Sequence, residues 1–210
     1  MKLALILMVS TGVASAEVLP HEYQDDGACK IVVYDGTRVV RTEEFSRDRE
    51  GRLEGERLTV DNVVIATSYA YEGGRLASTS MDGDHAAFEY DTRNQLVKAA
   101  YQRAGSKLVT YVWTFGYDAQ GRHVHTLATR GTRTVVDKRY SYDPKGRLDT
   151  ITSDDLVERH AYDRAGRVIR RDEITGTLTK SFTYAYDAKG RLASQTQGTT
   201  RHVYDYGCQK

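Results

Sequence analysis

Four of the six histidines stand at positions where imidazole rings could hold a metal ion. His123 and His125 are two residues apart, which would place both rings on one face of a strand, a spacing compatible with two zinc ligands. His160 and His202 take places that are aromatic in similar segments of the chain. The alternative is that each imidazole replaces an aromatic ring and is hydrogen-bonded to a nearby hydroxyl. Because no acidic or thiol ligand has matching spacing, the sequence favours this alternative and predicts no metal ion and no cofactor.

Carboxylates are the other groups that could do chemistry. Asp82, Asp84, Asp154 and Asp155 could act as acid and base on a glycosidic bond, but they lie in predicted turns, where carboxylates more often cap backbone amides. The sequence also lacks a Gly-x-Ser-x-Gly elbow, a His-Glu-x-x-His motif and a glycine-rich phosphate loop. It therefore predicts no catalytic residues and no enzyme activity.

The elements that would position these side chains belong to a repeat. Six times a Gly-Arg pair follows an aromatic-rich segment, and a seventh copy has Asn94-Gln95 in its place. Such a period is typical of proteins in which one supersecondary unit stacks on its neighbours. The motif residues are the glycines Gly51, Gly74, Gly121, Gly146, Gly166 and Gly190, the arginines Arg52, Arg75, Arg122, Arg147, Arg167 and Arg191, and the tyrosines Tyr71, Tyr90, Tyr117, Tyr142, Tyr162 and Tyr186.

Each repeat predicts a β-hairpin. In the segment 143–146, Asp, Pro and Gly take their preferred places in a type I turn, and the glycine adds a left-handed bulge. Tyr140 and Tyr142 precede this turn and share one face of a strand. The arginine after each turn lies close in sequence to the tyrosine before it, so we expect its guanidinium to stack on that ring. Counting segments between turns gives about sixteen strands. The fold class is therefore all-β, an antiparallel meander of hairpins in a curled or wrapped sheet.

Two cysteines lie near the two ends of the repeat region. Cys29 and Cys208 allow one pairing, and an even number of cysteines in an exported protein favours a disulfide. A redox role is the alternative, but neither cysteine has a second thiol nearby in sequence. A bond between them would close the curled sheet and bring its first and last strands together.

The N-terminus has the three parts of a secretory signal peptide. Met1-Lys2 is positively charged, residues 3–9 are apolar, and residues 14–16 form a small-x-small cleavage site. We expect cleavage between Ala16 and Glu17, which divides the chain into a signal peptide at 1–16 and one β domain at 17–210. The protein is then exported, to the periplasm or the medium.

The charge of the exported chain restricts its partners. Removing residues 1–16 takes away one lysine, which leaves 29 Lys+Arg against 29 Asp+Glu (30 − 1 = 29). A neutral chain argues against a nucleic-acid partner, which would need a basic surface. An outer-membrane barrel is an alternative, because the sequence combines a signal peptide with many short strands. Residues 170–173 are consecutive charges, so both sheet faces are charged, and the sequence predicts no membrane insertion.

The repeated residues resemble a known family. The segment 115–122, Phe-Gly-Tyr-Asp-Ala-Gln-Gly-Arg, and its siblings are similar to the YD repeat, also called the RHS repeat, and the resemblance covers Phe45 to Tyr206. In large members such repeats form a sheet that spirals into a hollow shell around a C-terminal toxin. This chain has fewer repeats and lacks the paired Asp-Pro-x-Gly motif of self-cleavage. The resemblance therefore implies the strand-and-turn architecture and not toxin delivery.

These observations leave three functions open. The sequence favours a non-catalytic binding or scaffold module for a protein or glycan of the cell envelope, in which exposed tyrosine and arginine columns could hold a sugar ring or a peptide. The first alternative is an inhibitor or immunity-type partner of a secreted toxin or enzyme. The second is a small glycan-acting hydrolase. Neither the ligand nor the oligomeric state follows from the sequence.

Overall fold

The computed structural model describes the backbone of residues 4–8 and 15–19 and all atoms of residues 27–208. β1 (Ala4–Met8) and β2 (Ser15–Leu19) form a separate two-stranded antiparallel sheet in which Ala4 is paired with Leu19. The expected signal peptide at 1–16 lies partly outside the described residues, and its expected cleavage bond falls within β2, so it stays a prediction. No helix in the described part of the chain is long and apolar enough to cross a membrane.

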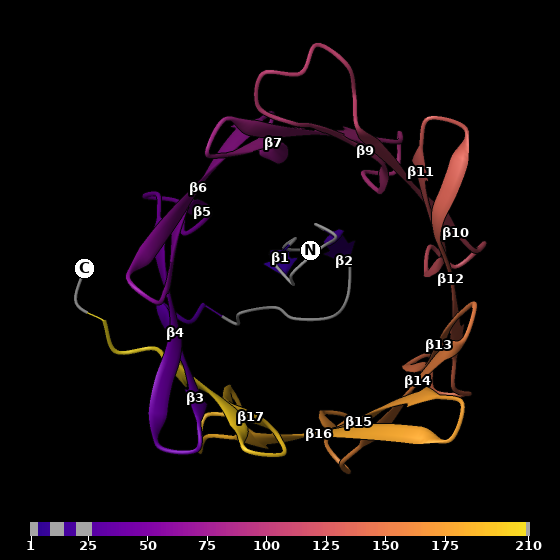
Figure 1. Ribbon diagram of the computed structural model, residues 1–210. Helices are drawn as coiled ribbons and strands as arrows, with labels where there is room; N and C mark the ends of the chain where they lie inside the picture. Colours follow the sequence, from indigo (N-terminus) through magenta and orange to yellow (C-terminus); the bar gives the residue numbers. More distant parts are fainter. Residues whose placement is uncertain (1–3, 9–14, 20–26, 209–210) are drawn as a thin grey trace.

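The remaining strands form a closed antiparallel barrel, as Figure 1 shows from one end. Each of its sixteen strands pairs with its two neighbours in sequence, and the last pairs with the first. This confirms the predicted fold class and the estimate of strand number. The strands are β3 (Lys30–Asp35), β4 (Arg38–Arg47), β5 (Leu53–Val60), β6 (Val63–Glu72), β7 (Arg75–Met81), β8 (Asp84–Tyr90), β9 (Leu96–Gln102), β10 (Tyr111–Tyr117), β11 (His123–Arg130), β12 (Arg133–Tyr142), β13 (Leu148–Ser153), β14 (Leu156–Tyr162), β15 (Val168–Thr175), β16 (Leu178–Tyr186), β17 (Leu192–Gln197) and β18 (Thr200–Asp205).

The meander gives the barrel two rims with different turns. The repeat rim carries the turns of the Gly-Arg motif, from 48–51 to 187–190. The far rim carries the other turns of the hairpins, which lie between β3 and β4, β5 and β6, and so on to β17 and β18. Most far-rim turns have two residues, whereas the loop between β9 and β10 spans residues 103–110.

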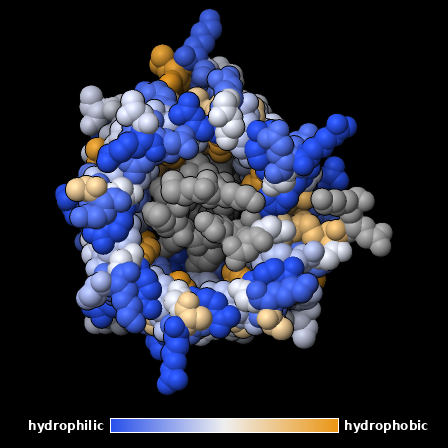
Figure 2. All heavy atoms as spheres, turned by 180° about the vertical axis from the view of Figure 1, so that it is seen from behind, coloured by the Kyte–Doolittle hydropathy of each residue, from blue (hydrophilic) through white to orange (hydrophobic). Residues whose placement is uncertain are grey.

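The two faces of the sheet differ in polarity. Buried and exposed residues alternate along β10, where Trp113 and Phe115 are buried and Thr114 between them is exposed. Figure 2 shows mainly hydrophilic residues on the outside of the ring and hydrophobic ones along its inner edge. The buried residues therefore form the inner wall. The main core cluster consists of Leu53, Tyr69, Leu76, Phe88, Leu96, Ala99, Trp113, Phe115 and Ala128.

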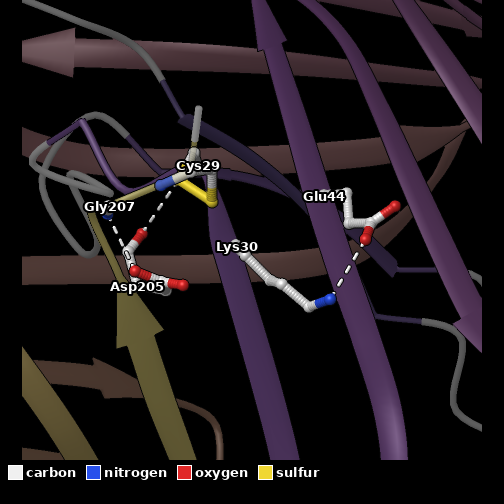
Figure 3. The surroundings of a disulfide bond; sticks show 6 residues. Cys29, Lys30, Glu44, Asp205 and Gly207 are labelled. Atoms are coloured by element: carbon white, nitrogen blue, oxygen red, sulfur yellow. Dashed lines mark hydrogen bonds and ion pairs between the residues drawn. A yellow bond between two sulfur atoms is a disulfide. The ribbon is translucent and has the colours of Figure 1, made fainter. Parts of the chain in front are cut away.

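The seam between the last and first strands is held by a ladder and a disulfide. β18 and β3 pair from Thr200 with Asp35 to Asp205 with Lys30. Beyond the ladder, the Cys29 amide donates to the Asp205 carbonyl at 2.9 Å, and the Cys29–Cys208 disulfide follows, with a Cα–Cα distance of 6.0 Å (Figure 3). The predicted pairing of the cysteines and the meeting of the two ends are confirmed.

Removing this bond should destabilise the barrel without unfolding it. The disulfide joins residues 179 apart in sequence, and closing such a loop contributes up to about 5 kcal/mol in the chain-entropy model. We expect the Cys29→Ala/Cys208→Ala variant to keep its β circular-dichroism spectrum, because the seam ladder remains, and to lose several kcal/mol of unfolding free energy in urea. A reductant should lower the wild type to the same value and leave the variant unchanged. An unchanged urea midpoint in the variant would contradict a stabilising role for the bond.

Candidate functional site

The turns of the repeat rim are built around one aspartate. Asp143 Oδ1 accepts the backbone amides of Lys145 and Arg147 at 2.8 and 2.9 Å, and Oδ2 accepts Arg147 Nε at 2.7 Å. The Gly146 amide donates to the Asp143 carbonyl at 2.8 Å, and Gly146 has a φ of 77°, which an L-residue rarely adopts. These contacts confirm the predicted type I turn with a glycine bulge. The same carboxylate–arginine pair occurs in the turns of Asp48, Asp118, Asp163 and Asp187.

The arginine of each turn also contacts the next turn. The Arg147 guanidinium lies 4.4 Å from the ring centroid of Tyr162, and the Tyr162 hydroxyl donates to the Leu148 carbonyl. The expectation that the arginine stacks on the tyrosine before its own turn was therefore wrong. The partner is the tyrosine one repeat later, because the two strands of the intervening hairpin bring it back to the same rim. The other stacked pairs are Arg52–Tyr71, Arg75–Tyr90, Arg122–Tyr142, Arg167–Tyr186 and Arg191–Tyr206.

We call this series of contacts the turn ladder, and it is incomplete at two adjacent turns. The turn before Arg75 has no aspartate, and Arg75 instead contacts Asn94 Oδ1 of the next turn at 3.5 Å. In that next turn Gln95 replaces arginine, and its Nε2 donates to the Gly121 carbonyl at 2.9 Å. Tyr117 keeps its hydroxyl bond, to the Leu96 carbonyl at 2.7 Å. The degenerate copy at Asn94-Gln95 therefore lacks the arginine–tyrosine stacking contact, but its backbone follows the same turn as the other copies.

One arginine of the ladder has a matched control in its own turn. Arg167 pairs with Asp163 and lies over Tyr186, whereas Arg164 is exposed and makes no ion pair or ring contact with the described residues. Arg167→Ala should lower the melting temperature by about 2–4 °C, because it removes a cation–π contact and an ion pair. Arg164→Ala should leave it unchanged. Equal melting temperatures for the two variants would show that the ladder contributes nothing.

The same contacts lower the pKa of the turn aspartates. The backbone amide of the following arginine, and then its side chain, hold the pKa of Asp143, Asp163 and Asp187 below the ordinary value. In the unfolded chain these carboxyls take up protons at higher pH than in the barrel. Their contribution to stability is therefore complete above the ordinary aspartate pKa and is lost as the pH falls through the lowered one.

Acid should consequently weaken the barrel through these turns. Between about pH 5 and pH 3 we expect the melting temperature of the wild type to fall. In the triple variant Asp143→Asn/Asp163→Asn/Asp187→Asn the fall should be smaller, since three titrating groups are gone. Melting curves followed by circular dichroism at both pH values measure the difference, and parallel pH profiles would contradict this assignment.

His123 packs as an aromatic ring in the core. It is fully buried, and its ring centroid lies 4.2 Å from that of Tyr140 and 5.6 Å from that of Tyr117. Its Nε2 lies 2.9 Å from Thr126 Oγ1, which in turn lies 3.1 Å from the Tyr140 hydroxyl. The hydroxyl bond is the one expected in the alternative to a metal site, although His123 takes the place that Leu or Val has in the other repeats.

The spacing of His123 and His125 predicts that both rings lie on one face of the strand. In the structure they lie on opposite faces. The register shifts where Tyr117 pairs with His123 and Gly116 with His125, so Val124 is an extra residue that reverses the alternation. His125 Nε2 lies 2.8 Å from Asp137 on the outer face, because Asp137 and the inward Tyr140 are three residues apart on one strand.

The four histidines also do not converge. His160 lies on β14 and His202 on β18, and neither strand neighbours β11 or the other in the barrel. Within the described side chains, the one group of three potential metal ligands is Cys29, Asp205 and Cys208, whose two cysteines form the disulfide.

The inner wall has an apolar arc. It runs from β5 to β11, and its largest members are the rings of Tyr69, Phe88, Trp113 and Phe115, with exposed fractions of 5 to 8%. Partly buried rings, including Tyr111, pack against it. Aromatic and aliphatic side chains are the groups that bind apolar parts of a polypeptide.

A charged arc lies on the opposite part of the wall, on β12 to β16. Arg171 donates to Glu158 at 3.3 Å and to Glu173 at 2.9 Å, and its guanidinium lies 4.3 Å from the Phe182 ring centroid. Glu158 faces inward, because it pairs with the buried Ile151. Burial lowers the pKa of Lys138, which belongs to the same group. Sequence reasoning missed this arc, although the run 170–173 showed that charges lie on both faces.

A smaller polar group lies on the inner wall at the seam. Arg41 contacts Glu43 at 2.7 Å, and burial raises the pKa of Glu43. Burial, together with Arg41, lowers the pKa of His202 to about 4, so this ring is neutral at neutral pH. His202 and Arg41 both pair with Val33, which is buried, and so they share its inward face.

Comparison with known proteins finds similarity to one protein sequence and to solved structures. The "tRNA3(Ser)-specific nuclease WapA" of Bacillus spizizenii is 26% identical over 155 residues, which are 70% of this chain and 6% of the nuclease. The solved structure "Crystal Structure of TcdB2-TccC3-Cdc42" is 15% identical and is matched over 77% of this chain and 12% of its own, with a TM-score of 0.33. A porin-like protein from Bacteroides uniformis is 11% identical over 84% of this chain and 95% of its own, with a TM-score of 0.59, which shows similarity of fold alone.

The chain spans 6% of the length of the nuclease that it matches, so it corresponds to one segment of that protein. A model of the family described as "Teneurin YD-shell" matches residues 22–182, which include the turns of the repeat rim up to Gly166-Arg167 and the strands up to β15. The chain therefore belongs to the Teneurin YD-shell family and is a YD-repeat, or RHS-repeat, protein.

Proposed function

We propose that this YD-repeat protein is an exported, non-catalytic module that binds a polypeptide of the cell envelope or the medium against the inner wall of its barrel. The observation that carries the proposal is the division of that wall into an apolar arc on β5–β11 and a charged arc on β12–β16. A polypeptide segment with one apolar and one charged side matches both arcs at once.

The closed topology supports recognition by side chains. Open sheets often bind peptides by adding a strand to a free edge. Here β18 pairs with β3, so every strand of the barrel has two partners and offers no edge. Recognition must therefore use the wall, the rims or the outer face. Of these, the wall combines buried aromatic rings with buried charges, which is the combination that gives affinity and specificity.

The ladder favours a protein ligand over a glycan. Sugar binding by the repeated tyrosines would require open ring faces. In the ladder these rings are covered by guanidinium groups, at 4.1 Å for Tyr206 and 4.4 Å for Tyr162. Among the described residues, Trp113 and Phe115 on the inner wall have no such guanidinium over their rings, and we assign the ligand to that wall.

The remaining alternatives use the same observations. An inhibitor or immunity-type partner would hold a segment of a secreted toxin or enzyme on the same wall, and identification of the bound protein separates it from a scaffold. A hydrolase has less support, because Glu158 is paired with Arg171 at 3.3 Å and is not poised as a free acid. The nuclease name of the matched relative belongs to a protein of which this chain spans 6%, and we do not transfer that activity.

Site-specific photo-crosslinking tests the proposal. A photoreactive phenylalanine analogue placed at Phe182 faces the inner wall, and the same analogue at Thr183 faces outward on the same strand. After illumination in the producer's envelope and medium, we expect a discrete protein adduct from position 182 and none from position 183. Mass spectrometry then identifies the adduct and the segment that carries it.

Two results would count against this function. Equal adducts from both positions would mean non-specific capture. A cross-link from position 182 only to the chain's own residues would mean that the wall is covered from within and not by a separate partner.

A further inference from the structure

The far rim gathers the exposed aliphatic side chains of the barrel. Of the eight large hydrophobic residues that are exposed among residues 27–208, seven lie within four residues of a far-rim turn, and Ile169 is the exception. The exposed fractions reach 77% at Leu108, 73% at Leu178 and 61% at Val63. The seven, which we call the aliphatic rim, are Val39, Val63, Val64, Leu108, Val109, Val135 and Leu178. The inner wall and the turn ladder use none of them.

Such a concentration on one end is unusual for a surface that stays in water. Singly scattered aliphatic residues need no explanation, but a group confined to one rim marks an interaction surface. The repeat rim provides the internal comparison. The turns of both rims connect the same sixteen strands. The repeat rim, however, exposes charged residues of the turn ladder in place of aliphatic ones.

Four neighbouring turns of the same rim separate into an acidic pair and a basic pair. The turn between β5 and β6 carries Asp61, and the next turn, between β7 and β8, carries Asp82. The two that follow are basic, with Arg103 in the β9–β10 loop and Arg130 and Arg133 beside the β11–β12 turn. Two acidic turns therefore stand next to two basic ones in barrel order, and all five side chains belong to exposed residues.

The order of these four turns is self-complementary. A second barrel can face the first rim to rim about a two-fold axis that passes between β8 and β9. The β7–β8 turn then lies opposite the partner copy's β9–β10 loop, and the β5–β6 turn lies opposite its β11–β12 turn. Asp82 meets Arg103, Asp61 meets Arg133, and Val63 and Val64 meet Val135. A two-fold interface pairs each patch twice, so every attraction is doubled.

We propose that the far rim is a self-association surface through which two copies of this chain stack mouth to mouth. The occupant is a second copy because the charges of these four turns match those of the same four turns turned over. The two apolar rims are buried against each other, and the two interiors become one longer chamber.

Sedimentation equilibrium of the purified chain tests the stacking. We expect a monomer–dimer equilibrium with a dissociation constant of about 1–50 μM. Arg133→Glu should shift the chain to monomer, because acid then faces acid at both Asp61 contacts. Asp61→Lys should do the same, with base facing base. Since Asp61 has a φ of 47°, lysine is strained there, and a melting curve confirms that the variant is folded.

Mixing the two variants distinguishes stacking from a general loss of solubility or fold. In the mixed pair both contacts join opposite charges again, so Asp61→Lys and Arg133→Glu chains should form a dimer together that neither forms alone. Lys145→Glu on the repeat rim is the matched control and should dimerise as the wild type does. A wild-type chain that stays monomeric at about 100 μM overturns the proposal. This holds even if the aliphatic rim binds lipid vesicles instead of a second copy. A mixture that stays monomeric overturns the proposal as well.

Discussion

The structure depends on a single repeated contact, the carboxylate of a turn aspartate bonded to the arginine four residues later. One oxygen of Asp143 fixes the backbone of its own turn, and the other fixes the Arg147 side chain. Held in this direction, the guanidinium covers Tyr162, whose hydroxyl returns a bond to the strand that leaves the first turn. Each turn therefore positions the next. The barrel inherits its spacing from a contact made at the rim, before any core residue is considered.

Where that contact is missing, the core is richest. The two incomplete turns lie between β6 and β7 and between β8 and β9, and the main hydrophobic cluster extends from Leu53 on β5 to Ala128 on β11. Where the ladder is complete, from β12 to β17, the inner wall carries Glu158 and Arg171. Buried ion pairs rarely stabilise a fold, because desolvation offsets their attraction. The complete part of the ladder thus coincides with the arc that holds charges in place of apolar side chains.

Features set by residues close in sequence could be predicted, and so could the pairing of the two cysteines, which follows from their number. The turn type at 143–146, the number of strands and the pairing of Cys29 with Cys208 follow from spacing and composition, and the structure contains all three. Contacts between repeats could not be derived in this way, since the arginine's partner lies a whole hairpin away. The face of a residue was also lost wherever a bulge intervenes. Val124 moves His125 to the outside, and the same extra residue recurs two places after the motif arginine in other repeats, as Asp149 and Ile169. No single residue type marks this position, so the bulge could not be recognised from residue type.

Closure explains how the ladder ends. Tyr206 takes the place of a repeat tyrosine, with Arg191 at 4.1 Å from its ring centroid and its hydroxyl bonded to the Leu192 carbonyl at 2.9 Å. No aspartate follows it. Gly207 and Cys208 come instead, and the covalent bond to Cys29 takes over the task of joining this turn to the next strand. A spiral sheet has a free edge at each end, whereas here β18 pairs with β3 and the disulfide joins the same seam. Because closure leaves no strand edge, any ligand must be recognised by the inner wall, a rim or the outer face. Of these surfaces, the inner wall has buried aromatic and charged side chains, and the far rim has exposed aliphatic ones.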